Sequence, residues 1–457
     1  MHGDILTKYL ALGPATFGLP TTDETGVPGY GPGRKSELLG ATIYWSGVTG
    51  AWEVHGEIRN KWLASGGPLV FGMPTSDEQN VTGIEGKWNQ FQNANIYWSA
   101  VTTAHEVHGA ILAKYLEGGG VGGPAGPLGL PITDEYSSGS GRRSDFDGGY
   151  IYWEARSGAQ VYAGAVNTMT ADTTFEARDG NGALLATLGA GQVASVRYNK
   201  ITGIYSVQAP GVYLTGTSYI RFTATGGIVR ATSYHDVPSW DTSLDDNKFR
   251  GTIEVRYSPV SDAVWIVNEL PVEDYMKGIA ETSSGSPAEF LRTMTVAARS
   301  YAIWHLDRNG KYGGSEIFHL KNSRNGNGDD QVYKGYGLEA RFPTLVTAVN
   351  TTAGQVVTYD GTVAMTSYFS NSDGRTRSAL EVWGVDYWPW LASVSEPYDA
   401  GMTMAGHGVG LSGHGALARA NLGVTYSEIL GYYYTGTVLS TVNTNRNIRI
   451  AISHVTP

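Results

Sequence analysis

The pattern of apolar and polar positions in the first 155 residues repeats three times. Each repeat opens with His-Gly, at a spacing of 53 residues, and continues as a short helical pattern that ends near an aromatic residue: ILTKYL, IRNKWL and ILAKYL. A turn signature follows (FGLPTTDE, FGMPTSDE, LGLPITDE), then a Gly-rich loop and a strand that reads Ile-Tyr-Trp. The pattern predicts a unit of helix, tight turn, loop and strand. Because so small a unit can hardly bury its own aromatic face, we expect stacked neighbours to share a core.

The polar residues that recur in this pattern have structural explanations. The aspartates follow a Gly-x-Pro step and can hydrogen-bond their own backbone, so we expect them to form turns. The histidines stand at the predicted helix starts, where a structural hydrogen bond is the expected role. Their spacing shows periodicity and no convergence of ligands, so no metal site is predicted. The residues concerned are Asp23, Asp77, Asp134, His2, His55 and His108.

The pattern changes over residues 158–240. Alternating runs such as TTFEARD, ASVRYN, GIYSVQA and SYIRFTAT are separated by Gly and Asn, which is typical of short antiparallel strands. We interpret this segment as a small β domain or as a β extension of the C-terminal region. Its last residues, 235–246, are polar and read as a connector.

Residues 241–445 mix strand and helix patterns. Two strands, FRGTIEVRYSP and AVWIVNEL, precede a short helix with Pro271 at its first position and with Glu273 and Lys277 paired across one turn. Ser286-Pro287-Ala288-Glu289 reads as a capping box that starts a longer amphipathic helix ending near Tyr301.

Further strands are predicted in TLVTAVNTTAGQVVTYDG and VAMTSYFSNS, and a Gly-rich turn, GHGVGLSGHG, leads into a last helix. Residues 446–457 are interpreted as a tail. The fold class is therefore α+β, with small N-terminal repeats, a β-rich middle and a mixed α+β C-terminal domain.

Composition and charge exclude several functions. The net charge is −10 and no basic stripe interrupts it, so nucleic acid is not an expected partner. Because there is no cysteine, disulfides and thiolate metal sites are excluded. No apolar run is long enough for a transmembrane helix, and the first residues lack the features of a signal peptide. No cofactor is expected.

The surface chemistry is compatible with sugars. Only 16% of residues are charged, while the chain has 28 Tyr, 12 Trp and 62 Gly. Such a composition suits neutral polar ligands, and it equally suits a loop-rich β protein that keeps its aromatic residues in cores.

Glu281 is the candidate for chemistry. It stands between the short helix and the long one, where a carboxylic acid can be both buried and directed at a cleft. Burial raises a carboxyl pKa, and a raised pKa suits a general acid. The alternative is structural: Glu281 caps the following turn or pairs with Arg299.

The two regions resemble two known families. The repeats at residues 1–157 resemble LGFP repeats of actinobacterial cell-wall proteins, which implies attachment to a cell-wall polysaccharide. Residues 241–445 resemble the stage II sporulation protein D family, also called amidase enhancers. The blocks that carry this second resemblance are ELPVEDYMKGIAE, FLRTMTVAARSYA, DDQVYKGYG, AVNTTAGQVVTYDG, YFSNSDGRT, EVWG, HGVGLSGHGA and YSEILGYYYTGT.

The second resemblance implies an activity similar to that of lytic transglycosylases, which act on peptidoglycan glycan strands, with Glu281 as the catalytic acid. Such an enzyme can work with one carboxylate, because the group that protonates the leaving oxygen then deprotonates the sugar's own 6-hydroxyl. Hydrolysis usually needs a second carboxylate.

Further residues are candidates for substrate binding. Arg299 is expected in a buried ion pair, Gln331 and Tyr333 either line a sugar cleft or form a turn and strand, and Asp373 replaces a glycine of the family pattern and could supply a second carboxylate. His407 and Ser412 match a His-Gly-x-Gly-x-Ser block whose usual Gln is here Gly413. The full set is Arg299, Tyr301, Gln331, Tyr333, Ser370, Asp373, Arg375, Thr376, His407 and Ser412. A metal at His407 and a Ser412–His407 nucleophile pair are weaker possibilities.

These observations predict a secreted, cell-wall-associated enzyme that binds wall polysaccharide through its repeats and cleaves glycan strands through Glu281. Two alternatives stay open. One is a non-catalytic peptidoglycan-binding protein that stimulates a separate amidase. The other is a glycoside hydrolase that uses two carboxylates, Glu281 with Asp373 or Asp330.

Overall fold

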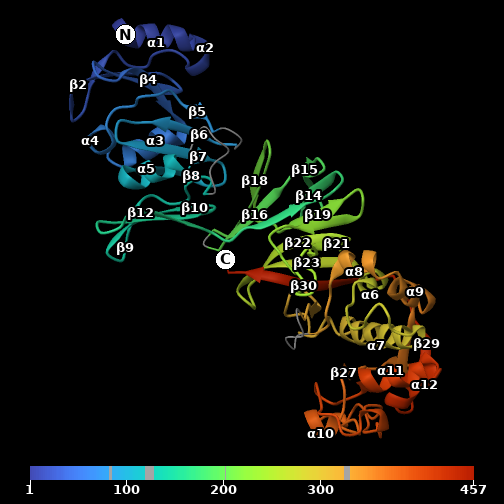
Figure 1. Ribbon diagram of the computed structural model, residues 1–457. Helices are drawn as coiled ribbons and strands as arrows, with labels where there is room; N and C mark the ends of the chain where they lie inside the picture. The colour runs from blue at the N-terminus through green and yellow to red at the C-terminus, as the bar shows by residue number, and fades with distance from the viewer. Residues whose placement is uncertain (82–84, 119–127, 201, 324–329, 457) are drawn as a thin grey trace. The chain divides into compact units, whose positions relative to one another are not determined.

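The computed structural model describes residues 1–81, 85–118, 128–200, 202–323 and 330–456. The chain forms two compact units (Figure 1). The first comprises residues 1–166 and 194–218, and the second comprises residues 167–193 and 219–456. The segment that we predicted as a separate β region, 158–240, is thus divided between the two units.

The first unit alternates single helices with four-stranded antiparallel sheets (Figure 1). Each repeat contributes the predicted helix and Ile-Tyr-Trp strand, and three further strands that sequence reasoning left as loop. The helices are α1 (Gly3–Leu12), α3 (Gly56–Ala64) and α5 (Gly109–Glu117), with the single turns α2 (Pro14–Phe17) and α4 (Pro68–Phe71) after the first two.

The strands of the three sheets are β1 (Thr25–Val27), β2 (Tyr30–Glu37), β3 (Ala41–Ser46) and β4 (Gly50–His55); β5 (Gln79–Asn80), β6 (Lys87–Gln90), β7 (Ala94–Ser99) and β8 (Thr103–His108); and β9 (Tyr136–Ser138), β10 (Gly141–Phe146), β11 (Gly149–Glu154) and β12 (Gly158–Ala163). A meander of β16 (Ala194–Asn199), β17 (Ile204–Ala209) and β18 (Val212–Gly216) completes the unit.

Neighbouring repeats share their cores, as the small size of the unit predicted. Trp62 of α3 is fully buried between the two sheets. Its ring meets Tyr44 of the first sheet edge-on at 4.8 Å and stacks on Phe91 of the second at 5.1 Å. A helix that completes the core of two sheets explains why the pattern has to recur along the chain.

Charged residues join the repeats at equivalent positions. Asp77, which we expected to form a turn, forms an ion pair with Lys8 on the helix of the preceding repeat and accepts a hydrogen bond from the Glu53 backbone N–H, so its side chain links two repeats. His55, which opens the second repeat, lies between Glu53 of the first repeat, at 2.8 Å, and Glu78 of its own repeat, at 3.4 Å. The same contacts recur in the next junction, among Lys61, Asp134, Glu106, His108 and Glu135.

The second unit is built on a seven-stranded sheet in the order β15-β14-β19-β22-β23-β30-β24. The strands are β15 (Leu184–Leu188), β14 (Phe175–Asp179), β19 (Ile220–Ala224), β22 (Thr252–Ser258), β23 (Ala263–Pro271), β30 (Asn447–Val455) and β24 (Leu320–Lys321). A ladder of β13 (Asn167–Thr170), β20 (Ile228–Ala231) and β21 (Lys248–Arg250) also belongs to this unit. The prediction of a tail at 446–457 is wrong for β30, which pairs with β23 along its length and buries Ile448 and Ile450.

The remaining elements lie between β23 and β30 in the chain, and several of them pack on the long helix α7 (Ala288–Leu306), whose residues are buried on most faces. They are the helices α6 (Val272–Lys277), α8 (Gly335–Arg341), α9 (Pro343–Thr351), α10 (Ala379–Trp383), α11 (Gly413–Asn421) and α12 (Tyr426–Tyr433), the 3-10 turn η2 (Pro397–Asp399), and the strands β25 (Gln355–Tyr359), β26 (Thr362–Val363), β27 (Tyr368–Phe369), β28 (Leu411–Ser412) and β29 (Val438–Thr441). The mixed order confirms the α+β class.

Three local predictions in this unit were wrong. The run TLVTAVNT forms α9, because Pro343 suits a first helical turn and the apolar residues then lie on one buried face. The capping box does not form: Pro287 occupies the N-cap of α7, and Glu289 accepts a hydrogen bond from the Tyr426 N–H. The predicted pair of Glu273 with Lys277 does not form: Glu273 pairs with Arg299, and Lys277 pairs with Asp274.

Candidate functional site

Glu281 is held by a short antiparallel contact between two loops. Ile279 bridges Tyr333, the Ala280 N–H donates to the Val332 carbonyl at 2.8 Å, and the Val332 N–H donates to the Glu281 Oε1 at 2.8 Å. Gly278 is needed there because a Cβ would lie 2.5 Å from the buried Tyr333 ring. The backbone therefore fixes where the carboxyl group points.

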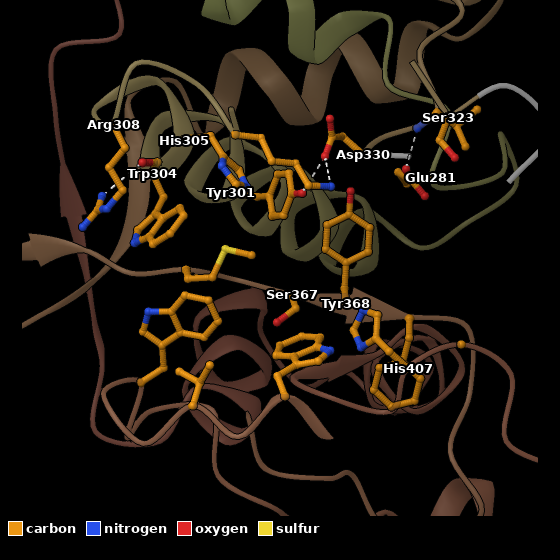
Figure 2. A pocket seen from close by; sticks show the side chains of 18 of the residues that line it. Glu281, Tyr301, Trp304, His305, Arg308, Ser323, Asp330, Ser367, Tyr368 and His407 are labelled. Atoms are coloured by element: carbon orange, nitrogen blue, oxygen red, sulfur yellow. Dashed lines mark hydrogen bonds and ion pairs between the residues drawn. The ribbon is translucent and has the colours of Figure 1, made fainter. Parts of the chain in front are cut away.

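Glu281 lines a cleft of about 960 Å³ in the second unit. One wall comes from the loops around Glu281 and Asp330 and from the C-terminal half of α7, and the other from residues between Met365 and Gly413. Figure 2 shows Tyr368 reaching from the second wall toward Asp330 and Glu281 on the first.

The surroundings of Glu281 favour its protonated form. Burial raises the pKa of Glu281 above its ordinary value, and hydrogen bonds from the Val332 N–H and the Tyr368 hydroxyl oppose this only in part. A half-buried carboxyl group with a raised pKa, open to a cleft, is suited to donate a proton.

Asp330 is the second carboxylate of the cleft, and its side chain is buried and fully engaged. It accepts a hydrogen bond from the Tyr301 hydroxyl at 3.1 Å (Figure 2). It also accepts one from the Lys321 N–H at 2.7 Å and forms an ion pair with Lys311. These three contacts occupy both carboxylate oxygens of Asp330.

Two histidines of the cleft are neutral at physiological pH. Burial lowers the pKa of His305 to about 4. Desolvation also lowers the pKa of His407, whose ring packs against Trp383 at 5.1 Å and Phe369 at 5.7 Å. The His407 Nδ1 accepts the Val409 N–H at 3.1 Å, so this nitrogen has a structural role.

The structure brings three of the predicted binding residues into the cleft with Glu281: Tyr301, Ser370 and His407. Two others are exposed: Asp373 pairs with Arg377, and Arg375 pairs with Glu381. Neither belongs to the described residues that line the cleft. The suggestion of Asp373 as a second carboxylate of the site is therefore corrected.

The other five candidates are buried in the protein and serve as supports. Arg299 is 0% exposed and binds Glu273, which corrects the alternative that it pairs with Glu281. Tyr333 donates to Asn268, and the Thr376 hydroxyl accepts the Val394 N–H.

Gln331 and Ser412 support the walls of the cleft. The Gln331 amide binds the Tyr275 and Tyr368 hydroxyls, both at 2.9 Å, and so holds the Tyr368 hydroxyl that also hydrogen-bonds Glu281. Ser412 donates to Asp399 at 2.7 Å, as does His414, so the serine does not form the nucleophile pair with His407 that we considered. In the described part of the chain, no group of three or more His, Asp or Glu side chains is arranged to hold a metal ion.

Sequence reasoning missed the aromatic and basic residues of the cleft. They are Trp304, Arg308, Lys311, Trp383, Tyr387 and Trp388. The run EVWGVDYWPW (381–390) could have indicated this aromatic part of the cleft. Its aromatic residues follow neither the strand nor the helix periodicity, so core packing of a regular element did not explain them.

Comparison with known proteins agrees with this architecture. A family model described as LGFP repeat matches residues 17–68, 71–123 and 128–169, and one described as Stage II sporulation protein matches residues 260–359. The chain carries LGFP repeats and a stage II sporulation protein domain. The resemblances seen in the sequence are therefore confirmed, and both matches fit a cell-wall-associated protein.

Three relatives align with parts of the chain. An uncharacterized protein of Brachyspira hyodysenteriae is 34% identical over 140 residues, which are 30% of this chain and 35% of the relative. Stage II sporulation protein D of Bacillus subtilis is 30% identical over 172 residues, covering 33% of this chain and 47% of that protein. The protein of the same name from Bacillus amyloliquefaciens is 27% identical over 164 residues, covering 32% and 45%. The chain thus spans less than half the length of each relative.

The sporulation-protein match includes Glu281, Tyr301 and Asp330, and it ends before Ser370 and His407. The wall of the cleft that carries Tyr368 lies outside this match. Within the described residues, no helix is both long and apolar enough to cross a membrane.

Proposed function

We propose that the second unit cleaves the glycan strands of peptidoglycan as a lytic transglycosylase, with Glu281 as general acid and base. The LGFP repeats would hold the protein, outside the cell, on wall polysaccharide. The observation that carries the proposal is the placement of Glu281: half-buried at a loop contact, with a raised pKa, and open to a cleft large enough for sugars.

The reaction needs one titrating group. Protonated Glu281 gives its proton to the glycosidic oxygen as the bond from that oxygen to the anomeric carbon breaks. The Glu281 carboxylate then takes the proton from the 6-hydroxyl of the same sugar, and the 6-oxygen bonds to the anomeric carbon. The products are a free hydroxyl on one strand and a 1,6-anhydro sugar on the other, and Glu281 is protonated again.

Hydrolysis through two carboxylates is the second candidate, because Asp330 lines the same cleft. A hydrolase needs a carboxylate that is free to activate water or to attack the sugar. Both Asp330 oxygens already accept hydrogen bonds or ion-pair contacts, from Tyr301, Lys311 and the Lys321 N–H. This arrangement favours the single-acid reaction.

Mass spectrometry of digested glycan strands separates the candidates. Anhydro ends from the wild type, lost in Glu281→Gln, would support the transglycosylase. The matched control is Asp373→Asn, an exposed carboxylate outside the cleft, which should leave the yield unchanged. Reducing ends that disappear in Asp330→Asn would support the hydrolase.

A third result would contradict both enzymatic proposals. If the protein binds glycan, yields no new ends and accelerates an added amidase, the cleft is a binding site for a non-catalytic enhancer. Near wild-type release of anhydro ends by Glu281→Gln would also exclude Glu281 as the acid.

A further inference from the structure

The cleft has two chemically different ends. We call Glu281, Asp330 and Tyr368 the acid end, and Trp304, Trp383, Tyr387 and Trp388 the aromatic end. Figure 2 shows Trp304 and Arg308 well separated from Glu281 and Ser323 along the same cavity. The proton transfer proposed above uses only the acid end.

The aromatic end leaves ring faces free. Trp388 is its centre and meets Trp304, Trp383 and Tyr387 at 5.5, 6.2 and 5.4 Å, with planes inclined by 82°, 88° and 73°. Edge-to-face packing of this kind fixes the rings while leaving flat faces available. Trp383 is 39% exposed and Tyr387 is 68% exposed, so solvent-accessible aromatic surface remains.

Local structure holds these rings in place. Trp383 is the last residue of α10, which Ser378 and Glu381 cap reciprocally, and Gly384 ends the helix with a left-handed φ of 69°. The Arg308 guanidinium lies 4.1 Å from the Trp304 ring centroid and donates to the Trp304 carbonyl at 3.1 Å. These contacts within the protein therefore fix the rings of the aromatic end without a ligand.

The chemistry of a glycan strand fits this surface. Pyranose rings present patches of C–H groups that pack on aromatic faces, and their hydroxyls need a polar group at the edge, which Arg308 beside Trp304 supplies. The volume of about 960 Å³ is at the top of the range of about 300–1,000 Å³ for ligand pockets. The cavity therefore accommodates more than one sugar ring.

We propose that the aromatic end is a glycan subsite remote from the bond that is cleaved, and that it makes binding depend on strand length. The proposal rests on the proposed function, because its ligand is the same strand that reaches Glu281. A strand long enough to cover both ends gains stacking on Trp383 and Tyr387, and a short fragment at the acid end does not.

The test measures binding by calorimetry in the Glu281→Gln background, where no cleavage interferes. The ligands are peptide-free peptidoglycan fragments of two and of eight sugars. We expect Trp383→Ala and Tyr387→Ala each to weaken binding of the eight-sugar fragment by about 5- to 10-fold, the effect of losing one aromatic contact. Binding of the two-sugar fragment should change less than about 2-fold. Trp240→Ala is the matched control, since Trp240 is 74% exposed and lies outside the residues that line the cleft.

Each outcome decides the proposal. Equal losses for both fragments, or no loss for either, would overturn the subsite while leaving the proposed cleavage intact. If the Glu281→Gln protein binds neither fragment and the wild type yields no glycan ends, the proposed function fails as well. Should Trp383→Ala unfold α10, the highly exposed Tyr387 still gives the answer, because its removal disturbs little packing.

Discussion

The ion pair between Glu273 and Arg299 joins α6 to α7, the two helices that the Glu281 loop connects, and its removal gives a sharp test of the fold. Arg299 is 0% exposed, and its Nη2 lies 2.7 Å from the Glu273 Oε2. Its other hydrogen bonds go to neutral groups: the Thr352 hydroxyl and the carbonyls of Val349 and Gln355. Glu273 is thus its charged partner among the described contacts.

We expect Glu273→Gln to lower the free energy of unfolding by about 3 kcal/mol. Removing one member of a buried ion pair costs about 3–5 kcal/mol, because the remaining charge is left in a medium that solvates it poorly. The lower end applies, since the Glu273 side chain is 23% exposed. The glutamine amide has one acceptor oxygen, so it cannot accept both from Arg299 and from the Gly354 N–H and the Thr444 hydroxyl, which donate to the other oxygen of Glu273.

Urea unfolding followed by tryptophan fluorescence measures this change. The matched control is Asp274→Asn, on the same helix, whose pair with Lys277 has side chains 31% and 20% exposed. We expect a loss below about 1 kcal/mol there. Losses of equal size in the two variants would refute the reasoning.

A double-mutant cycle isolates the pair itself. Combining Glu273→Gln with Arg299→Met removes the unpaired charge, so the double variant should be more stable than the sum of the single losses predicts, by at least about 1.5 kcal/mol. Additive losses would mean that Glu273 stabilises the protein through its other hydrogen bonds.

Three further predictions concern pH and packing. Tyr368→Phe removes a hydrogen bond that lowers the pKa of Glu281, so the alkaline limb of glycan cleavage should move to higher pH; an unchanged limb would contradict the assignment of Glu281 as the acid. A hydrogen bond to the Glu53 carboxylate raises the pKa of His55 in the folded protein above the unfolded value of 6.5. The stability that protonated His55 contributes is therefore complete below pH 6.5 and is lost as pH rises through the folded pKa. The Tm difference between wild type and His55→Gln should shrink from pH 5.5 to 8.5. Gly278→Ala should cost about 1–3 kcal/mol in urea unfolding, because the added Cβ meets a buried tyrosine ring, whereas Gly285→Ala, which meets open space, should be close to neutral.

The sequence was sufficient for features that depend on near neighbours. The repeats showed their helices, their Ile-Tyr-Trp strands and their need for a shared core, because apolar periodicity records which face a segment buries. The presence of the long helix α7 and the position of Glu281 between two helices were also readable, although the end of α7 at Leu306 was not. Both depend on residues within about one or two helical turns.

Only the tertiary structure decided the partners. β30 lies beside β23, although some 180 residues separate them in the chain, so its apolar residues read locally as a tail. Arg299 was recognised as a buried charge, but Glu273, 26 residues away, could be identified only once α6 packed on α7. Local patterns favoured the pair of Glu273 with Lys277 within the short helix, and they gave no sign of the buried pair of Glu273 with Arg299.

The same division applies to the site. The sequence, with the family resemblance, selected Glu281 as the candidate acid, and three of its ten candidate binding residues, Tyr301, Ser370 and His407, line the same cleft. The tertiary structure placed Arg299 and Asp373 elsewhere, and it brought Trp304 of α7 against Trp388 to form the aromatic end. Residue type and local pattern determine what a side chain can do, whereas long-range packing determines what it faces, because the energy of burying a ring or pairing a charge depends on segments that are distant in the chain.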